Sequence, residues 1–504
     1  MRQNSVIYIF ILLILSSTLF GKPNLDSLIS AGNEQSFQFN FPAAQKTFDT
    51  IIKFYPESSQ GYYFIGRNSL WFYLANKDGA SKEKFKKYNK IALEKAETEY
   101  SSNSDSPKFN YYLGNIYLLN SIYNSSEQNS MDAFWATKKA VSYLESSIEL
   151  NEKYFEPRLS LGTIQYALGF VPGFLGWAIS IAGLEGDKIE GMKNIKLVLE
   201  NCKSCKVEAT YHLSKIYTEY NAMYDKAESL LTRIMDNYPR NELFLYQYAI
   251  LQIDLKDLIR AEEILNIMIY EFPNHYFTQT YALSFFLKGE IHFKRNRFKE
   301  AIKEYESFIS KATSPDYTGF ANLKIALSYE MLNQKLNAQK HYILARNGNQ
   351  SIAEDLSADE LSKNYFDKIF SDNDKILIQA KNHNEAGNYN KAIEVLKKFD
   401  EKNSTKESLF EVNVLKIDIF QNLKQFDKPI EIFNKYKKKS AISSLKDYPK
   451  YLYLRASQKY NNKKYADSQK DILDAFKVVD ESDNKLQRLL VNLQQKLAEK
   501  KNNH

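Results

Sequence analysis

Two alanines, Ala227 and Ala261, lie 34 residues apart and begin the same pattern of side chains. Large apolar residues follow at +4 and +7 and a proline at +12, namely Leu231, Ile234 and Pro239 in one unit and Leu265, Met268 and Pro273 in the other. A period of this length, with a small residue before an apolar stripe, predicts stacked helical hairpins that pack mainly on their neighbours. Such a stack is a scaffold rather than a catalytic fold.

The same spacing recurs along the chain. A small residue precedes the alanine position by 12 residues in four hairpins, at Ala249 and Ala261, Gly289 and Ala301, Ala326 and Ala338, and Ala380 and Ala392. The pattern resembles the tetratricopeptide (TPR) repeat, which implies an all-α, TPR-like α-solenoid of about ten to eleven hairpins. A leucine stripe within 480–501 predicts a C-terminal helix that caps the stack.

Irregular spacing divides the chain into segments. Ala140 follows Gly114 by 26 residues and Gly191 follows Gly162 by 29, so hairpins three and four carry insertions, which in repeat proteins usually form loops. The predicted segments are a signal peptide at 1–21, atypical TPR-like hairpins with long inserts at 22–203, regular TPR repeats at 204–350, an extra helix or linker at 351–372, and basic TPR-like repeats with the cap at 373–504.

The first 21 residues have the organisation of a secretory signal peptide. Arg2 is followed by an uncharged run at 6–20 and by the small residue Gly21. The run is shorter than the roughly 20 apolar residues of a membrane span. We therefore expect an exported protein of the periplasm or cell envelope, with an extracellular location or an uncleaved N-terminal anchor as the alternatives.

Positive charge is concentrated near the C-terminus. The formal net charge is +7, and residues 374–504 contain 27 Lys+Arg against 18 Asp+Glu. This region is either an ordinary solvated helix surface or a basic patch, densest at Lys437, Lys438 and Lys439, that meets an acidic partner or an anionic membrane. We expect no nucleic-acid partner.

Motifs that support catalysis are missing from the sequence. Its six histidines are scattered, and no nucleophile elbow, phosphate-binding loop or dinucleotide fingerprint occurs. We therefore predict a non-enzymatic protein without catalytic, cofactor or metal sites.

The only cysteines, Cys202 and Cys205, favour a local disulfide in an exported protein, with a free thiol pair as the alternative. A zinc site needs two further ligands, and only His212 is near in sequence.

Residues 168–187 are strongly apolar and interrupted by glycine and proline. The segment predicts either a short helix folded into the core or an exposed apolar lid that rests on a membrane, with Phe170, Phe174, Leu175 and Trp177 as its large side chains.

The order of motifs in this segment resembles a known family. Gly169 to Pro172 reads GFVP, Phe174-Leu175 follows, and Gly183 to Asp187 reads GLEGD before an amphipathic helix. This order resembles the Iml-type TPR proteins, which include the eukaryotic inclusion-body-clearance proteins and exported bacterial relatives. The resemblance covers residues 40–240 and implies an adaptor. The eukaryotic members act at lipid droplets or mitochondria, whereas the signal peptide implies an exported form here.

First-helix side chains line the inner face of a TPR superhelix, and many of them are apolar in this chain. We expect an exported scaffold that binds a protein or peptide along this concave face. The predicted groove consists of Tyr211, Lys215, Tyr246, Ile250, Phe286, Glu290, Phe293 and Leu323. The alternatives are an envelope membrane-surface protein, held by residues 168–184 and the basic C-terminal third, and a binder of small ligands or glycans.

Export leads to a first prediction. Mass spectrometry of the protein from its source cell should find a mature N-terminus near Lys22, because the signal peptide is removed on secretion. Intact Met1 in the soluble cytosolic fraction would contradict the prediction.

Overall fold

The structure is a computed structural model of the whole chain, and it consists of helices without any strand in the part that it describes. The described residues are 22–170, 184, 186–272, 274–436, 442–480 and 483–502. They form two compact units. Unit 1 comprises the residues up to Leu213 together with Tyr238–Asn241, and unit 2 comprises Ser214–Asn237 and the residues from Glu242 onward.

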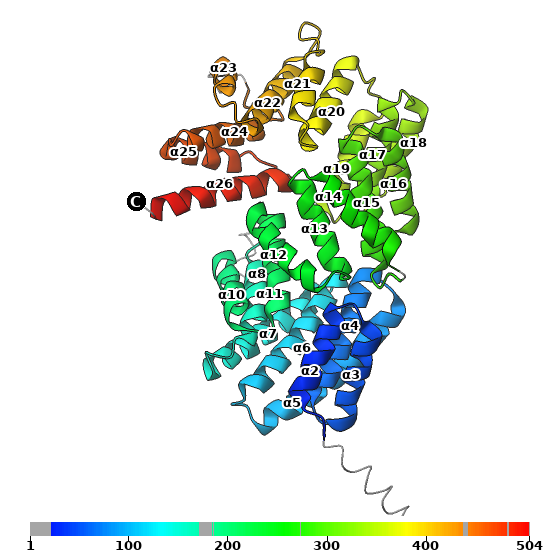
Figure 1. The fold of residues 1–504 in the computed structure, drawn as a ribbon, viewed down its shortest axis with the longest axis vertical. Coiled ribbons are helices and arrows are strands. Elements are labelled where there is room, and N and C mark those ends of the chain that lie inside the picture. Colours follow the sequence, from blue (N-terminus) through cyan, green and yellow to red (C-terminus); the bar gives the residue numbers. More distant parts are fainter. Residues whose placement is uncertain are drawn as a thin grey trace, which may run out of the picture. The chain divides into compact units, whose positions relative to one another are not determined.

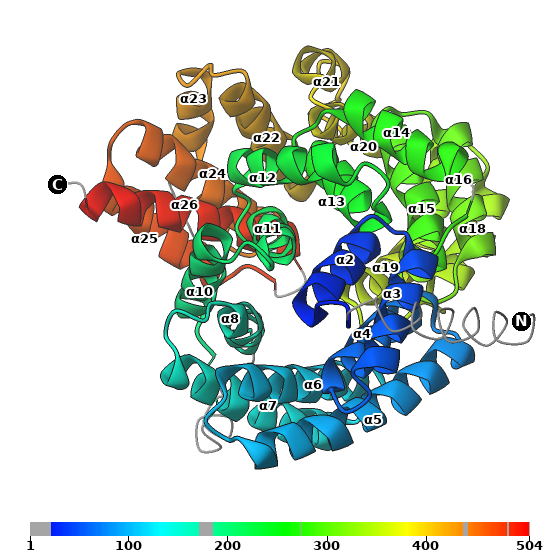
Figure 2. The same cartoon turned by 60° about the horizontal axis from the view of Figure 1, so that its bottom comes forward.

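Unit 1 consists of consecutive antiparallel hairpins, drawn from blue to green in Figure 1 and seen from a second direction in Figure 2. Its pairs are α2 (Leu25–Phe37) with α3 (Phe41–Phe54), α4 (Ser59–Asn76) with α5 (Gly79–Ser102), α6 (Pro107–Ser126) with α7 (Ser130–Leu150), and α8 (Glu156–Leu168) with α10 (Lys188–Asn201). The next first helix, α11 (Lys206–Lys215), begins in this unit.

Unit 2 continues the same design. Its first four hairpins are η1 (Ile216–Tyr220) with α12 (Tyr224–Asn237), α13 (Glu242–Asp254) with α14 (Leu258–Asn266) and η2 (Ile267–Glu271), α15 (Thr278–Lys294) with α16 (Phe298–Lys311), and α17 (Thr318–Met331) with α18 (Lys335–Ala345). The single helix α19 (Ala353–Tyr365) follows. The last three hairpins are α20 (Asp372–Glu385) with α21 (Tyr389–Leu396), α22 (Lys406–Asn422) with α23 (Lys428–Lys435), and α24 (Tyr448–Asn461) with α25 (Tyr465–Phe476), and the unit ends with α26 (Asn484–Asn502). Four hairpins in unit 1 and seven in unit 2 give eleven among the described residues, which confirms the predicted all-α stack.

Small residues sit where the two helices of a hairpin cross. A Cβ atom on Gly114 of α6 would lie 2.9 Å from Leu144 Cγ of α7. A Cβ on Gly289 of α15 would lie 2.7 Å from the ring of Tyr305 on α16. Real Cβ contacts are longer than this, so the helices reach their spacing only because these positions lack a side chain. The repeated small residues in the sequence are therefore packing positions.

The long inserts do not both form loops. In the third hairpin the extra residues lengthen the helices, so that α6 has 20 residues and α7 has 21. Met131 and Trp135 in the first turns of α7 are 67% and 53% exposed. In the fourth hairpin the extra residues lie between α8 and α10, largely outside the described residues.

The C-terminal helix α26 covers the end of unit 2, as predicted. Its leucine stripe is buried against α24 and α25. Its polar side returns to the start of the same unit, because Arg488 donates to Thr218 O at 3.2 Å and to Asp254 Oδ2 at 3.1 Å. Asn492 Nδ2 donates to Ala222 O at 3.2 Å. The cap thus contacts both the last hairpin of unit 2 and its first.

Several sequence predictions fall outside the described residues, including the signal peptide at 1–21 and the lysines at 437–439. No helix in the described part of the chain combines the length and apolar character needed to cross a bilayer.

Glu242, the first residue of α13, is buried. Burial raises the pKa of its carboxyl group to about 7, although hydrogen bonds from the backbone N–H groups of Tyr276 and Phe277 act in the opposite direction. The neighbouring His275, whose Nδ1 lies 3.8 Å from Glu242 Oε1, has a pKa lowered by its own burial and therefore does not supply a full charge at neutral pH.

Glu242→Gln should change how stability depends on pH. A folded-state pKa above the unfolded value means that the wild type loses stability as pH rises from the unfolded pKa to about 7. Relative to the wild type, the variant should gain about 2–3 kcal/mol of unfolding free energy between pH 4 and 8. Urea denaturation across this range measures the difference. The exposed Glu300→Gln serves as the control, and parallel pH profiles for wild type and Glu242→Gln would refute the expectation.

Ala261→Leu should destabilise unit 2. Ala261 on α14 is completely buried at a helix crossing, so added methyl groups overpack the hairpin at a cost of about 1–3 kcal/mol. Hydrogen exchange should lose protection first in residues 241–310, since repeats couple mainly to their neighbours. The exposed Ala80→Leu on α5 is the control. Unchanged exchange in 241–310 would show that this crossing tolerates leucine.

Candidate binding cavity

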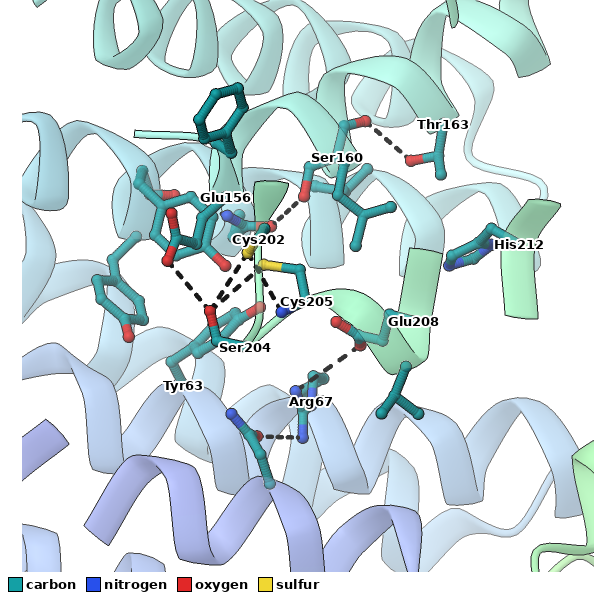
Figure 3. Close-up of a pocket in the computed structure, with 18 of the residues that line it drawn as sticks. Tyr63, Arg67, Glu156, Ser160, Thr163, Cys202, Ser204, Cys205, Glu208 and His212 are labelled. Carbon is teal, nitrogen blue, oxygen red and sulfur yellow. Dashed lines mark hydrogen bonds and ion pairs between the residues drawn. The ribbon is translucent and has the colours of Figure 1, made fainter. Parts of the chain in front are cut away.

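Unit 1 contains a cavity of about 1540 Å³. Its wall is formed mainly by α2, α4, α6, α8 and α11, which are the first helices of five successive hairpins. The turns before α8 and α11, together with Thr137 of α7, Asn201 of α10 and Tyr238, complete the wall. Figure 3 shows part of this lining. The volume exceeds the roughly 300–1,000 Å³ of typical small-molecule pockets.

Apolar side chains provide part of the surface of the cavity. Trp71, Tyr111, Tyr154 and Phe155 are partly exposed there, and Ile122 of α6 is 38% exposed. Burial raises the pKa of Tyr111 and the pKa of Tyr154 above the usual value for tyrosine, so both hydroxyls stay protonated at neutral pH. The wall therefore offers apolar contact area with neutral hydroxyl groups beside it.

Arg67 of α4 places a fixed positive charge in the wall (Figure 3). Its Nη2 donates to Asn33 Oδ1 at 2.9 Å, and its Nη1 lies 3.9 Å from Glu208 Oε1. The guanidinium carbon lies 4.9 Å from the ring centre of Phe64 and 4.5 Å from that of Trp71. Because contacts on several sides hold the guanidinium, it is oriented before any ligand arrives.

Charges of both signs line the cavity and many of them are paired. Lys108 Nζ lies 2.9 Å from Asp26 Oδ1, and the Tyr238 hydroxyl donates to Glu34 Oε2 at 2.8 Å. The acidic residues of the wall are Asp26, Glu34, Glu156 and Glu208, and the basic residues are Arg67, Lys108, Lys153 and Lys203. With equal numbers of each sign, the wall does not select a ligand by net charge.

The two cysteines belong to the same wall. Cys202 follows α10 as its C-cap, Cys205 directly precedes α11, and both are buried free thiols. The structure has the free thiol pair, which the sequence left open beside a disulfide. Hydrogen bonds occupy the sulfur of Cys202 instead: the Cys205 backbone N–H donates to it at 3.2 Å, and the Ser204 hydroxyl lies 3.3 Å away.

The two thiols differ in acidity. A hydrogen bond from the Cys205 thiol lowers the pKa of Cys202 and outweighs the opposing effect of burial. The same contact, together with burial, raises the pKa of Cys205. Cys202 is therefore the thiol of the pair that ionises first.

The structure places the aromatic side chains Phe286 and Phe293 of the predicted groove inside the helix stack. Phe286 is 7% exposed, and its ring centre lies 5.4 Å from that of Phe308 on the partner helix α16. Phe293 packs in the same way against Phe298, at 5.6 Å, and Leu323 is also buried. These side chains face neighbouring helices within the stack, because closing the hairpin buries more apolar surface than a groove would.

Of the other predicted groove residues, Tyr211 and Lys215 lie one turn apart on α11, and Tyr246 and Ile250 lie one turn apart on α13. All four side chains are partly buried. Lys215 Nζ lies 3.6 Å from Glu219 Oε2. Their role in binding stays a prediction.

Glu290, the remaining groove residue, accepts a hydrogen bond from the Tyr305 hydroxyl and lies 3.5 Å from Lys324 Nζ. Since both partners hold it within the packing of unit 2, it acts there as a structural ion-pair residue.

Of the predicted apolar lid, only Phe170 lies in the described part of the chain. It is exposed, and Lys188 Nζ lies 3.5 Å from its ring centre. Phe174, Leu175 and Trp177 lie outside the described residues.

No family model matches the chain, and no curated protein matches its sequence. Among solved structures, the chain is similar to the TPR domain of P58(IPK), with 16% sequence identity, a TM-score of 0.23, and coverage of 86% of this chain and 99% of that chain.

Proposed function

We propose that the protein is an exported, non-enzymatic scaffold that binds a peptide or an extended protein segment in the cavity of unit 1. The observation that supports this most directly is the composition of the wall. It has an area of partly exposed aromatic and aliphatic side chains, an oriented Arg67, and a volume larger than a small ligand needs. Location in the periplasm or cell envelope belongs to the same proposal and rests on residues 1–21.

The wall matches the chemistry of a peptide better than that of a uniform polymer. Peptides combine apolar side chains with backbone amides, and the wall combines Trp71, Tyr111 and Ile122 with polar groups. Aromatic side chains at such surfaces supply much of the binding energy. Arg67 is suited to a carbonyl or carboxylate of the segment, because its guanidinium is already held in place.

A membrane-surface role is the second candidate. The observation that favours it is the exposure of Met131 and Trp135 in the first turns of α7 and of Phe170 after α8. Tryptophan with apolar neighbours is typical of interfacial contact with lipid.

Removing apolar surface from the cavity should weaken peptide binding. Linear peptides selected from a random-sequence library on the wild-type protein are titrated against Trp71→Ala and Ile122→Asp. Loss of an aromatic anchor costs about 2 kcal/mol or more, which is at least about tenfold in the dissociation constant. Fluorescence anisotropy measures the affinities, and circular dichroism checks that helicity is retained.

Ile259→Asp is the matched control, because Ile259 on α14 is 68% exposed and lies outside the cavity wall. Equal affinity of the cavity variants and the wild type would rule out the cavity. A loss caused only by Tyr246→Ala or Ile250→Asp would move the site to unit 2. Liposome flotation that depends on Trp135 without any peptide binding would favour the membrane-surface role.

A further inference from the structure

Three side chains that can ligate a metal converge in the cavity wall. They are Glu156 at the start of α8, Cys202 and Cys205, and their ligand atoms lie within 4.8 Å of one another. The Ser204 hydroxyl lies among them, 3.1 Å from Glu156 Oε1, 3.3 Å from Cys202 Sγ and 3.8 Å from Cys205 Sγ. Figure 3 shows these contacts meeting at Ser204. The three ligand groups are thus directed at one common point.

The spacing of these atoms is close to that of a tetrahedral metal site. Zinc–sulfur bonds of about 2.3 Å place two sulfurs roughly 3.8 Å apart, so the observed group needs a contraction of at most about 1 Å. Two cysteines separated by two residues commonly supply one half of such a site from a single turn.

The turn also orients one of the sulfurs. The backbone N–H of Cys205 donates to Cys202 Sγ at 3.2 Å, and a hydrogen bond of this kind stabilises a thiolate ligand and fixes its direction. Cys205 directly precedes α11, where the positive end of the helix dipole favours the deprotonated sulfur that a metal requires.

We propose that Glu156, Cys202 and Cys205 bind a Zn²⁺ ion whose fourth coordination position opens to the cavity. Two thiolates with one carboxylate suit zinc, whereas Mg²⁺ and Ca²⁺ prefer oxygen ligands alone and Cu⁺ prefers sulfur. The fourth position takes water or a donor atom from a bound molecule. The ion also joins the start of α8 to the turn between α10 and α11.

This inference goes beyond the proposed peptide binding and does not depend on it. Zinc and a disulfide are mutually exclusive at this site, because each uses both sulfurs. Zinc should therefore protect the pair from oxidation, which gives a second measurable property besides affinity.

The full-length protein, reduced and freed of metal with a chelator, is titrated with Co²⁺ as a spectroscopic probe and then with Zn²⁺. One Co²⁺ per chain should give the thiolate charge-transfer and tetrahedral d–d absorption bands, and Zn²⁺ should displace it. Cys202→Ser should lose the charge-transfer band of the two-thiolate site. Glu156→Gln should weaken Zn²⁺ binding about tenfold or more. Glu152→Gln, at an exposed position in the turn before α8, is the matched control.

Ser204→Ala provides a variant that keeps all three ligands. It should bind Zn²⁺ at least as tightly as the wild type, since the hydroxyl now occupies the point where the ligands converge. Air oxidation of the thiols, followed by alkylation and mass spectrometry, should be slowed by equimolar Zn²⁺ in the wild type and in Ser204→Ala. Binding that is unchanged in Cys202→Ser or Glu156→Gln, or oxidation at the same rate with and without Zn²⁺, would overturn the proposal. Peptide affinity, measured separately, does not enter this result.

Discussion

The close approach of two helices at a residue without a large side chain is the contact on which this architecture depends. At the crossing of α8 and α10, a Cβ on Gly162 would lie 2.7 Å from Gly191 O, and one on Gly191 would lie 2.6 Å from Gly162 O. Two backbones meet there directly. Close crossings of this kind hold each first helix against its partner, and in unit 1 successive first helices form the wall of the cavity. The cavity is therefore a product of hairpin packing.

The fold was largely predictable because its signal is local. A small residue, an apolar stripe and a fixed period specify a hairpin within about 34 residues, and the extra helix α19 and the cap α26 follow the same local rules. The inserts were less predictable, since extra residues can extend two helices as well as form a loop. Hydrophobicity favours both outcomes, and only the packing of α6 on α7 decides between them.

The site was less predictable because it depends on which way side chains face and on residues far apart in the chain. Phe286 and Phe293 occupy first-helix positions, yet their rings pack into the stack, where more apolar surface is buried than in an open groove. Arg67 could have been noticed as a lone charge among buried residues of α4. Glu156 carried no signal, because 46 residues separate it from Cys202 and nothing in the period places them together.

The return of α26 to the first elements of unit 2 alters how that unit should come apart. A simple stack of repeats can fray from either end, since each hairpin is coupled only to the next. In unit 2, Arg488 and Asn492 bind elements about 270 residues earlier, and Lys485 pairs with Glu385 of α20. Loosening either end therefore breaks contacts at the other. Unit 2 should therefore unfold with the cooperativity of a globular domain, although its sequence consists of consecutive repeats.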